Sequence, residues 1–146
     1  MQRCSIKTSR FGVLEVEESR IIHFPEGLLG FPEQRRYIIL EHKPDSPFCW
    51  LQSMDSPDLA FVMASPLLIK EDYLESLPEK EKPFFHSESE DDIAVFSLVT
   101  IPQGDVEKMT INLTGPLVID VGAKTGKQVI LSEAGYDHRH PFLAQP

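Results

Sequence analysis

The chain has 146 residues, of which 41% are hydrophobic and 25% are charged, and its formal net charge at pH 7 is −9. This length and apolar content fit one folded domain with a normal core and exclude a disordered acidic tail. The charge argues against direct nucleic-acid binding, which needs a cationic surface, and no apolar run approaches the roughly 20 residues of a membrane-spanning helix.

Short strand-like runs separated by turn residues dominate the first half of the chain. A strand is predicted at 5–8, and a β-hairpin is predicted from strands at 11–17 and 20–24 with 17–19 as its turn. Between Phe24 and Pro32, two prolines and two glycines break regular structure. The β-branched and aromatic composition of the next runs predicts strands at 36–41, 48–53 and 59–64.

The second half contains the one predicted helix. Tyr73, Leu74 and Leu77 fall at helical spacing within 71–77, and Pro78 ends the run. Residues 80–92 are predicted to form a charged loop. Strands follow at 93–101, 109–113, 117–121 and 128–131, with 122–127 as a hairpin loop. About nine or ten short strands with one short helix predict an all-β single domain over 1–146, closed as a barrel-like sheet or a sandwich.

The segment from Glu71 to Asp92 concentrates the negative charge. Nine of the chain's 23 acidic residues lie in it, and only two lysines oppose them. Such a field on a small domain favours a basic partner and repels nucleic acid. Phe84 and Phe85 lie inside the segment. They are predicted to anchor the loop to the core, with an exposed apolar contact site as the alternative.

Motifs for catalysis, metals or cofactors are weak. Residues 122–127 resemble a phosphate-binding loop, but the spacing is one residue short and no helix pattern follows. His138 and His140 would share one face of an extended segment, yet a metal site needs three or four donors and no third is evident. A tail packed on the domain is the alternative. An enzyme with a His/Asp site near 137–140 therefore has little support, and no cofactor is predicted.

The redox and targeting signals are those of a cytoplasmic protein. Cys4 and Cys49 form no C-x-x-C pair, so they are predicted to be small, partly buried thiols. The N-terminal residues enter an alternating pattern directly and contain no apolar signal core, which predicts location in the cytoplasm.

Short motifs occur in a fixed order along essentially the whole chain. The opening motifs are RFG at 10–12 and IIHFPEGLLGF at 21–31; the middle ones are PFCWLQS at 47–53, PDLAF at 57–61 and VTIP at 99–102; the last ones are MTINL at 109–113, GPLVI at 115–119, GKQVIL at 126–131 and YDHRHP at 136–141. The ordered set resembles the flagellar assembly factor FliW family. Gly115 and Asp120 depart from the family pattern, in which Ala and Asn are expected.

The resemblance implies a small barrel-like all-β protein without enzymatic activity. It implies two partners: the carbon storage regulator CsrA, a basic RNA-binding dimer that represses flagellin translation, and flagellin itself. Flagellin that accumulates in the cytoplasm occupies the factor and frees CsrA to repress, whereas export of flagellin releases the factor and translation resumes. The alternative is a flagellin-specific cytoplasmic chaperone without a role in translation.

Candidate binding residues follow from charge for one partner and from apolar surface for the other. Acidic side chains that would steer a basic partner are the CsrA-binding candidates Glu71, Asp72, Glu88, Glu90, Asp91 and Asp92. Flagellin ends are amphipathic helical segments, so they need an apolar groove. The flagellin-binding candidates are Leu51, Gln52, Asn112, Leu113 and Tyr136, and for Leu113 plain core packing is the alternative.

Overall fold

The computed structural model describes residues 2–41, 43–75, 77–80, 83, 93–102, 105–131 and 134–142. These residues contain eleven strands, short 3-10 segments and no α-helix, which confirms the predicted all-β class. The strands are β1 (Arg3–Thr8), β2 (Gly12–Glu17), β3 (Ile22–His23), β4 (Arg36–Glu41), β5 (Phe48–Ser53), β6 (Ala60–Ala64), β7 (Ile93–Thr100), β8 (Thr110–Ile111), β9 (Leu117–Asp120), β10 (Thr125–Gln128) and β11 (His140–Pro141). The 3-10 segments include η1 (Glu18–Arg20), η2 (Pro66–Leu68) and η6 (Val106–Lys108).

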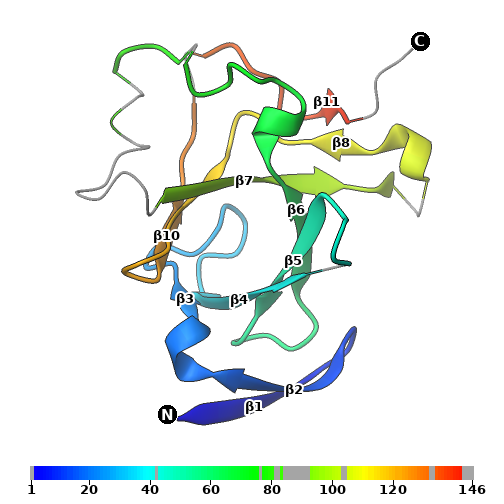
Figure 1. The fold of residues 1–146 in the computed structure, drawn as a ribbon, viewed down its shortest axis with the longest axis vertical. Coiled ribbons are helices and arrows are strands. Elements are labelled where there is room, and N and C mark those ends of the chain that lie inside the picture. The colour runs from blue at the N-terminus through cyan, green and yellow to red at the C-terminus, as the bar shows by residue number, and fades with distance from the viewer. Residues whose placement is uncertain are drawn as a thin grey trace.

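Strands β3, β4, β5, β6, β7, β9 and β10 close into a barrel (Figure 1). Neighbours from β3 to β7 are antiparallel, and β3 meets β10 through one parallel pair, Thr125 with His23. The first half of β7 pairs with β9, from Ile93–Asp120 to Phe96–Leu117, which completes the ring. The last residues of β7 pair with β8, and β11 extends that edge beyond the barrel. Closure leaves few exposed strand edges.

The N-terminal hairpin is a separate two-stranded sheet beneath the barrel (Figure 1). The predicted pairing of 11–17 with 20–24 is wrong, because β2 pairs with β1 and β3 enters the barrel. The turn explains the difference. The Thr8 hydroxyl donates to the Gly12 carbonyl at 2.8 Å and accepts from the Phe11 N–H at 2.9 Å, and Gly12 has φ 69°. This tight turn directs β2 back onto β1.

Two other predicted elements differ from the observed ones. Residues 71–75 form turns instead of a helix; a segment this short before Pro78 cannot offset the cost of helix nucleation, and Tyr73 is fixed by contacts elsewhere in the chain. The last predicted strand, 128–131, is observed at 125–128, because Lys124 adopts a left-handed φ of 57° and the turn ends there. Strand β11 was not predicted. Most of the predicted loop at 80–92 lies outside the described residues.

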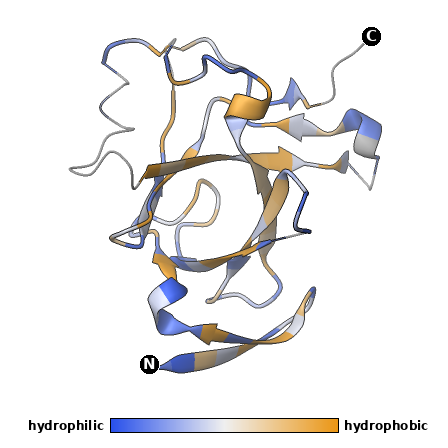
Figure 2. Cartoon of the chain, in the orientation of Figure 1, coloured by the Kyte–Doolittle hydropathy of each residue, from blue (hydrophilic) through white to orange (hydrophobic). Residues whose placement is uncertain are grey.

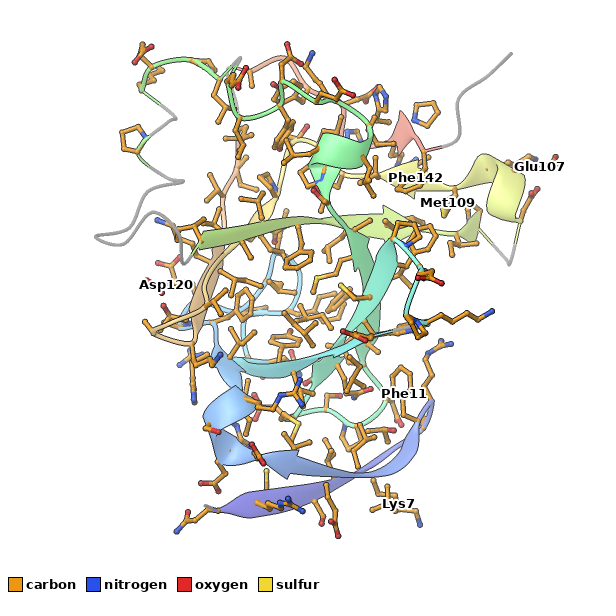
Figure 3. All side chains as sticks on the ribbon, viewed as in Figure 1. Lys7, Phe11, Glu107, Met109, Asp120 and Phe142 are labelled. Atoms are coloured by element: carbon orange, nitrogen blue, oxygen red, sulfur yellow. The ribbon has the colours of Figure 1, made fainter. Side chains whose placement is uncertain are left out.

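Apolar side chains fill the ring, and Figures 2 and 3 show them along the barrel strands and inside it. One buried cluster occupies the barrel: Ile22, Phe24, Leu28, Tyr37, Leu51, Met63, Leu117 and Ile119. A second lies between β7, β8 and the segment after β6, and includes Ala64, Tyr73, Leu77, Ile111, Leu113 and Leu131. A small third cluster of Val16, Ile21 and Ile38 attaches the hairpin.

One end of the barrel is filled by residues 24–32, here named the plug loop (Figure 1). Phe24 and Leu28 are buried in the barrel cluster. Gly27 has φ 67°, and a Cβ on it would lie 2.5 Å from the Phe31 carbonyl oxygen, so only glycine fits this turn. The backbone groups of Leu28 and Phe31 bond to each other at 2.7 and 3.3 Å.

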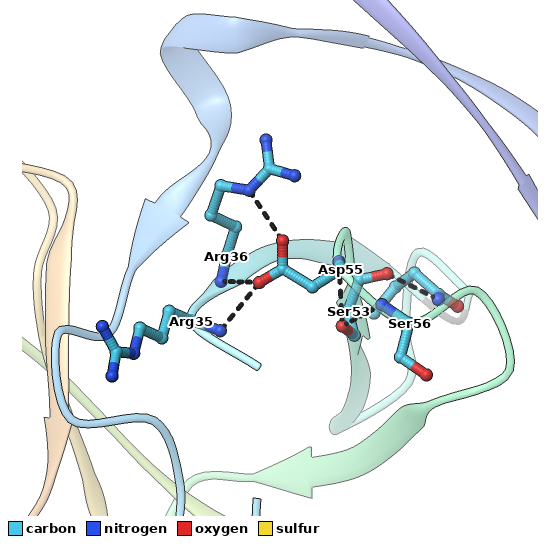
Figure 4. Close-up of polar contacts among 6 residues, drawn as sticks. Arg35, Arg36, Ser53, Asp55 and Ser56 are labelled. Atoms are coloured by element: carbon cyan, nitrogen blue, oxygen red, sulfur yellow. Dashed lines mark hydrogen bonds and ion pairs between the residues drawn. The ribbon is translucent and has the colours of Figure 1, made fainter. Parts of the chain in front are cut away.

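Asp55 fastens the start of β4 to the turn between β5 and β6 (Figure 4). Its carboxylate accepts from the backbone N–H groups of Arg35 and Arg36 at 2.8 and 3.0 Å, and from the Arg36 Nε at 2.8 Å. Partial burial pulls the pKa of Asp55 upward, but the donors of Arg35 and Arg36 outweigh it and lower that pKa below its ordinary value.

The variant Asp55→Asn is expected to lower the free energy of unfolding at pH 7 by about 1 kcal/mol, because an amide replaces charged acceptors. The pKa of Asp55 is lower in the folded state than in the unfolded state, where it is near 3.9. The ionised carboxylate therefore stabilises the fold above about pH 3.9, and this stabilisation is lost as pH falls through the pKa of the folded state. The difference in unfolding free energy between wild type and variant should therefore narrow below about pH 4. Urea unfolding at several pH values measures it, with exposed Asp45→Asn as the control. A gap that stays constant with pH contradicts this assignment.

Candidate functional site

Two tyrosines join the segment after β6 to the connection between β8 and β9. Tyr73 is fully buried, and its hydroxyl donates to the Leu113 carbonyl at 2.5 Å. Its ring stacks on Tyr136 with centroids 4.7 Å apart, and the Tyr136 hydroxyl donates to the Tyr73 carbonyl at 3.0 Å. Tyr73, Leu113 and Tyr136 are named the tyrosine clasp. It links three segments that are distant in sequence.

The backbone around the clasp is held by further hydrogen bonds. The side-chain oxygen of Asn112 accepts from the N–H groups of Thr114 and Gly115 at 3.0 and 2.9 Å. The Thr114 hydroxyl donates to the Tyr136 carbonyl at 2.7 Å, and the Leu113 N–H donates to the Asp137 carbonyl at 3.0 Å. Because both sides of the clasp are bonded at the main chain, its position is well determined.

Exposed carboxylates lie on the turn that carries Tyr73. Glu71, Asp72 and Glu75, named the acidic turn, are exposed, whereas Tyr73 between them is buried. Lys70 Nζ lies 3.2 Å from the Asp72 carboxylate and 5.9 Å from the centroid of the Tyr136 ring. Exposed pairs of this kind contribute little to stability. The acidic turn therefore presents its charge to solvent from an anchored backbone.

The structure brings together residues that were predicted for two different partners. Glu71 and Asp72 from the acidic set share the clasp region with Asn112, Leu113 and Tyr136 from the apolar set. Asn112 and Tyr136 are half-buried, whereas Leu113 is buried and holds Tyr73 through its carbonyl. The candidates Glu88, Glu90, Asp91 and Asp92 lie outside the described residues.

Leu51 and Gln52 lie in β5, in the barrel wall, and both are fully buried. Leu51 belongs to the barrel cluster. The Gln52 amide donates to the carbonyls of Pro57 and Leu59 at 3.2 and 3.1 Å and so holds the turn before β6. In this conformation the two residues shape the wall from inside, and a part for them in flagellin binding stays a prediction.

An exposed apolar surface next to the plug loop was not predicted. Leu29 is 76% exposed and Ile130 is 50% exposed, and both line a groove of about 320 Å³ together with Pro32 and Gln128. The Gln128 amide accepts from the Leu29 N–H at 2.7 Å and donates to the Gly115 carbonyl at 3.0 Å. We name Leu29, Pro32 and Ile130 the plug-loop patch. The Leu28-Leu29 doublet was the available signal, because adjacent side chains in a tight turn cannot both face the barrel.

The remaining reactive groups form no site in the part of the chain that the structure describes. No three His, Cys, Asp or Glu residues there lie close enough to hold a metal ion. His138 is exposed, and His140 pairs with Ile111 in β11. Cys49 is a free thiol whose pKa is raised to about 11 by burial and by the charge of Glu41. The described segments include no helix long and apolar enough to span a membrane.

Comparison with known proteins gives one consistent result. The family model described as FliW protein matches residues 5–143. The flagellar assembly factor FliW of Natranaerobius thermophilus is 37% identical over 138 residues, which cover 94% of this chain and 91% of the relative. That of Geotalea uraniireducens is 39% identical, with 94% and 83% covered. A crystal structure of the flagellar assembly factor FliW matches with a TM-score of 0.82 and 31% identity, over 97% of this chain and 98% of that one.

Proposed function

Because this chain belongs to the FliW family of flagellar assembly factors, which are not enzymes, we propose that it couples flagellin translation to flagellin export by exchanging two partners. In this proposal it binds CsrA and relieves repression of flagellin translation, and it binds flagellin when flagellin accumulates. The observation that supports the proposal best is the acidic turn, whose exposed carboxylates are carried by a backbone anchored through Tyr73.

The acidic turn suits a basic RNA-binding partner. Clustered charge on one surface raises the rate of encounter with an oppositely charged protein more than it raises intrinsic affinity. We propose that Glu71 and Asp72 act together with Glu88, Glu90, Asp91 and Asp92 in this steering. Once the complex forms, the same negative field disfavours RNA, because phosphate contacts supply much of the affinity for RNA-binding proteins. Direct blockage of the RNA site is not required.

Flagellin binding requires a different kind of surface. An amphipathic helix places its apolar face in a groove, and the plug-loop patch offers exposed Leu29 and Ile130 beside such a groove. The predicted residue Asn112 supports this patch from behind, because it fixes the Gly115 backbone that in turn holds Gln128. We propose that flagellin docks on the plug-loop patch and that Asn112, Leu113 and Tyr136 position it. The acidic turn and the plug-loop patch use different residues, but both are bonded to the segment 112–115, so one partner can weaken the other without direct overlap.

The double variant Glu71→Gln, Asp72→Asn is expected to slow association with CsrA about tenfold at low ionic strength, because steering by clustered charge accounts for factors of about 10 to 10³. The effect should shrink as salt screens the field. Stopped-flow association at two ionic strengths measures both, and extension to Glu88, Glu90, Asp91 and Asp92 should enlarge the loss. The matched control is Glu18→Gln, Asp45→Asn, which removes equal charge from exposed positions on other surfaces. Flagellin affinity should be unchanged in all variants.

Equal association rates for the two double variants would remove the acidic turn from the mechanism. If the wild-type protein captures flagellin but forms no complex with CsrA at any ionic strength, the proposed regulatory function is wrong. The alternative, a flagellin-specific chaperone, would then take its place.

A further inference from the structure

The barrel end opposite the plug loop contains a cavity of about 190 Å³. The strand register places it there: Phe24 contacts Gly126 at the plugged end, whereas Ile39, Ala94 and Val121 lie further along their strands toward the other end. The apolar lining consists of Ile22, Ile39, Ala94, Phe96, Ile119 and Val121. Ile22, Ile39, Phe96 and Ile119 pack in the barrel cluster, and Asp120, next to Ile119, lies at the barrel rim (Figure 3). The cavity is thus an apolar barrel mouth, a common place for small-molecule sites.

Two cations complete the lining of the cavity. Arg20 from η1 and Lys124 from the turn before β10 both line it. Among the described residues, neither side chain makes an ion pair or a hydrogen bond with a carboxylate. Two cations at one rim of an apolar cavity favour an anionic ligand group.

The backbone at Lys124 supports the same reading independently. Lys124 has φ 57°, and it is the one non-glycine residue with positive φ in the described part of the chain. Asn or Gly would occupy that conformation at lower cost, roughly 1 kcal/mol less for glycine. Strain of this kind concentrates at functional positions, and here it places a lysine at the cavity rim.

We propose that the barrel mouth binds a free medium-chain carboxylate, with its alkyl chain in the cavity and its carboxylate between Arg20 and Lys124. The volume of about 190 Å³ holds roughly six carbon groups at about 30 Å³ each, so an eight-carbon acid fits with its carboxylate and the adjacent methylene at the rim. A peptide C-terminus also carries a carboxylate, but its amide groups would enter a lining that offers no polar partner besides the two cations. Buried amides without hydrogen bonds are costly, whereas an alkyl chain has none to satisfy.

Titration of the full chain with octanoate, followed by calorimetry and by NMR of the Ile and Val methyl groups, tests the site. Saturable binding below the micellar concentration is expected, with shifts at Ile22, Ile39 and Ile119. The variant Arg20→Gln, Lys124→Asn should weaken binding at least tenfold, which two lost charge-assisted contacts readily supply; Asn tolerates the left-handed backbone. The control Lys7→Gln, Lys43→Gln removes equal charge at exposed positions and should bind like wild type.

Three further ligands and one variant with a filled cavity test which kind of ligand the barrel mouth binds. Octylammonium should not bind, and Ala94→Leu should abolish octanoate binding while the unfolding midpoint stays near that of wild type. Absence of saturable octanoate binding overturns the proposal, as does equal weakening in the lysine control. Octanol binding as tightly as octanoate removes the role of the cations. A peptide with an apolar C-terminus that binds more tightly than octanoate assigns the mouth to a polypeptide instead.

Discussion

Truncation of Phe24 to Ala is expected to remove about 3–5 kcal/mol of folding free energy, the usual cost of deleting a fully buried aromatic side chain. Phe24 is fully buried where the plug loop enters the barrel, and its ring packs edge-on against Tyr37 with centroids 5.3 Å apart. Loss of the ring leaves a cavity into which the surrounding strands cannot move, because each strand of the closed barrel is hydrogen-bonded to its neighbours. Urea unfolding monitored through the single tryptophan, Trp50, measures the loss.

Gly126 shows how closely this ring is packed. A Cβ on Gly126 would lie 2.6 Å from the Phe24 ring, so Gly126→Ala alone should destabilise the fold by about 1–3 kcal/mol. In a Phe24→Ala background the added methyl group has room. The double variant should therefore lose less unfolding free energy than the sum of the two single losses, by about 1 kcal/mol or more. Leu131→Ala in the second cluster is the control partner and should be additive with Gly126→Ala. Additivity in both pairs would contradict the observed contact.

The strands that the sequence predicts best are those with apolar residues on both faces. The predicted bounds of β4 and β5 agree with the observed ones. In β4, Tyr37 and Ile39 pack with the barrel cluster, whereas Ile38 and Leu40 pack with the cluster under the N-terminal hairpin. A continuous apolar run identifies such a doubly covered strand from composition alone. It does not identify what covers each face.

Strand pairing could not be predicted in the same way. Alternation in 11–17 and 20–24 predicts strands but not partners, and the hairpin was assigned to the wrong neighbour. The contacts that close the barrel, β3 with β10 and β7 with β9, join segments that are far apart in sequence. No local pattern encodes such pairs, because their selection depends on the register of the whole ring. Strands β3 and β11 have two residues each, so a local pattern says little about their partners.

The charge of the candidate site was evident from the sequence, but its anchor was not. Acidic residues cluster in sequence, so composition alone locates them. The clasp consists of side-chain to backbone bonds, and the bond from Tyr73 to Leu113 spans 40 residues. Any residue supplies a carbonyl acceptor, so no residue type at 113 signals the bond. The spacing of Tyr73 and Leu77 fits a helix, and the fixed tertiary contacts selected a turn instead.

Variants of the tyrosine clasp are expected to loosen the backbone of the acidic turn while leaving its carboxylates in place. Tyr73→Phe leaves the Leu113 carbonyl without its hydroxyl donor, which should cost about 1–2 kcal/mol of folding free energy. Tyr73→Ala also deletes a fully buried ring and should cost about 3–5 kcal/mol. Tyr136→Phe removes a hydroxyl from a half-buried ring and is the milder control. Urea unfolding should show the largest loss for Tyr73→Ala, a smaller one for Tyr73→Phe and the smallest for Tyr136→Phe.

The proposed steering role predicts a kinetic difference between the clasp variants and the charge variants. Tyr73→Phe keeps Glu71, Asp72 and Glu75, so long-range attraction and the salt dependence of association with CsrA should persist. The contacts made after docking depend on a fixed turn, so the dissociation rate should rise, about tenfold for each 1.4 kcal/mol of lost contact energy. Glu71→Gln, Asp72→Asn should instead lower the association rate. A Tyr73→Phe protein that associates as slowly as this charge variant, with the same reduced salt dependence, would show that charge and position are not separable in the acidic turn.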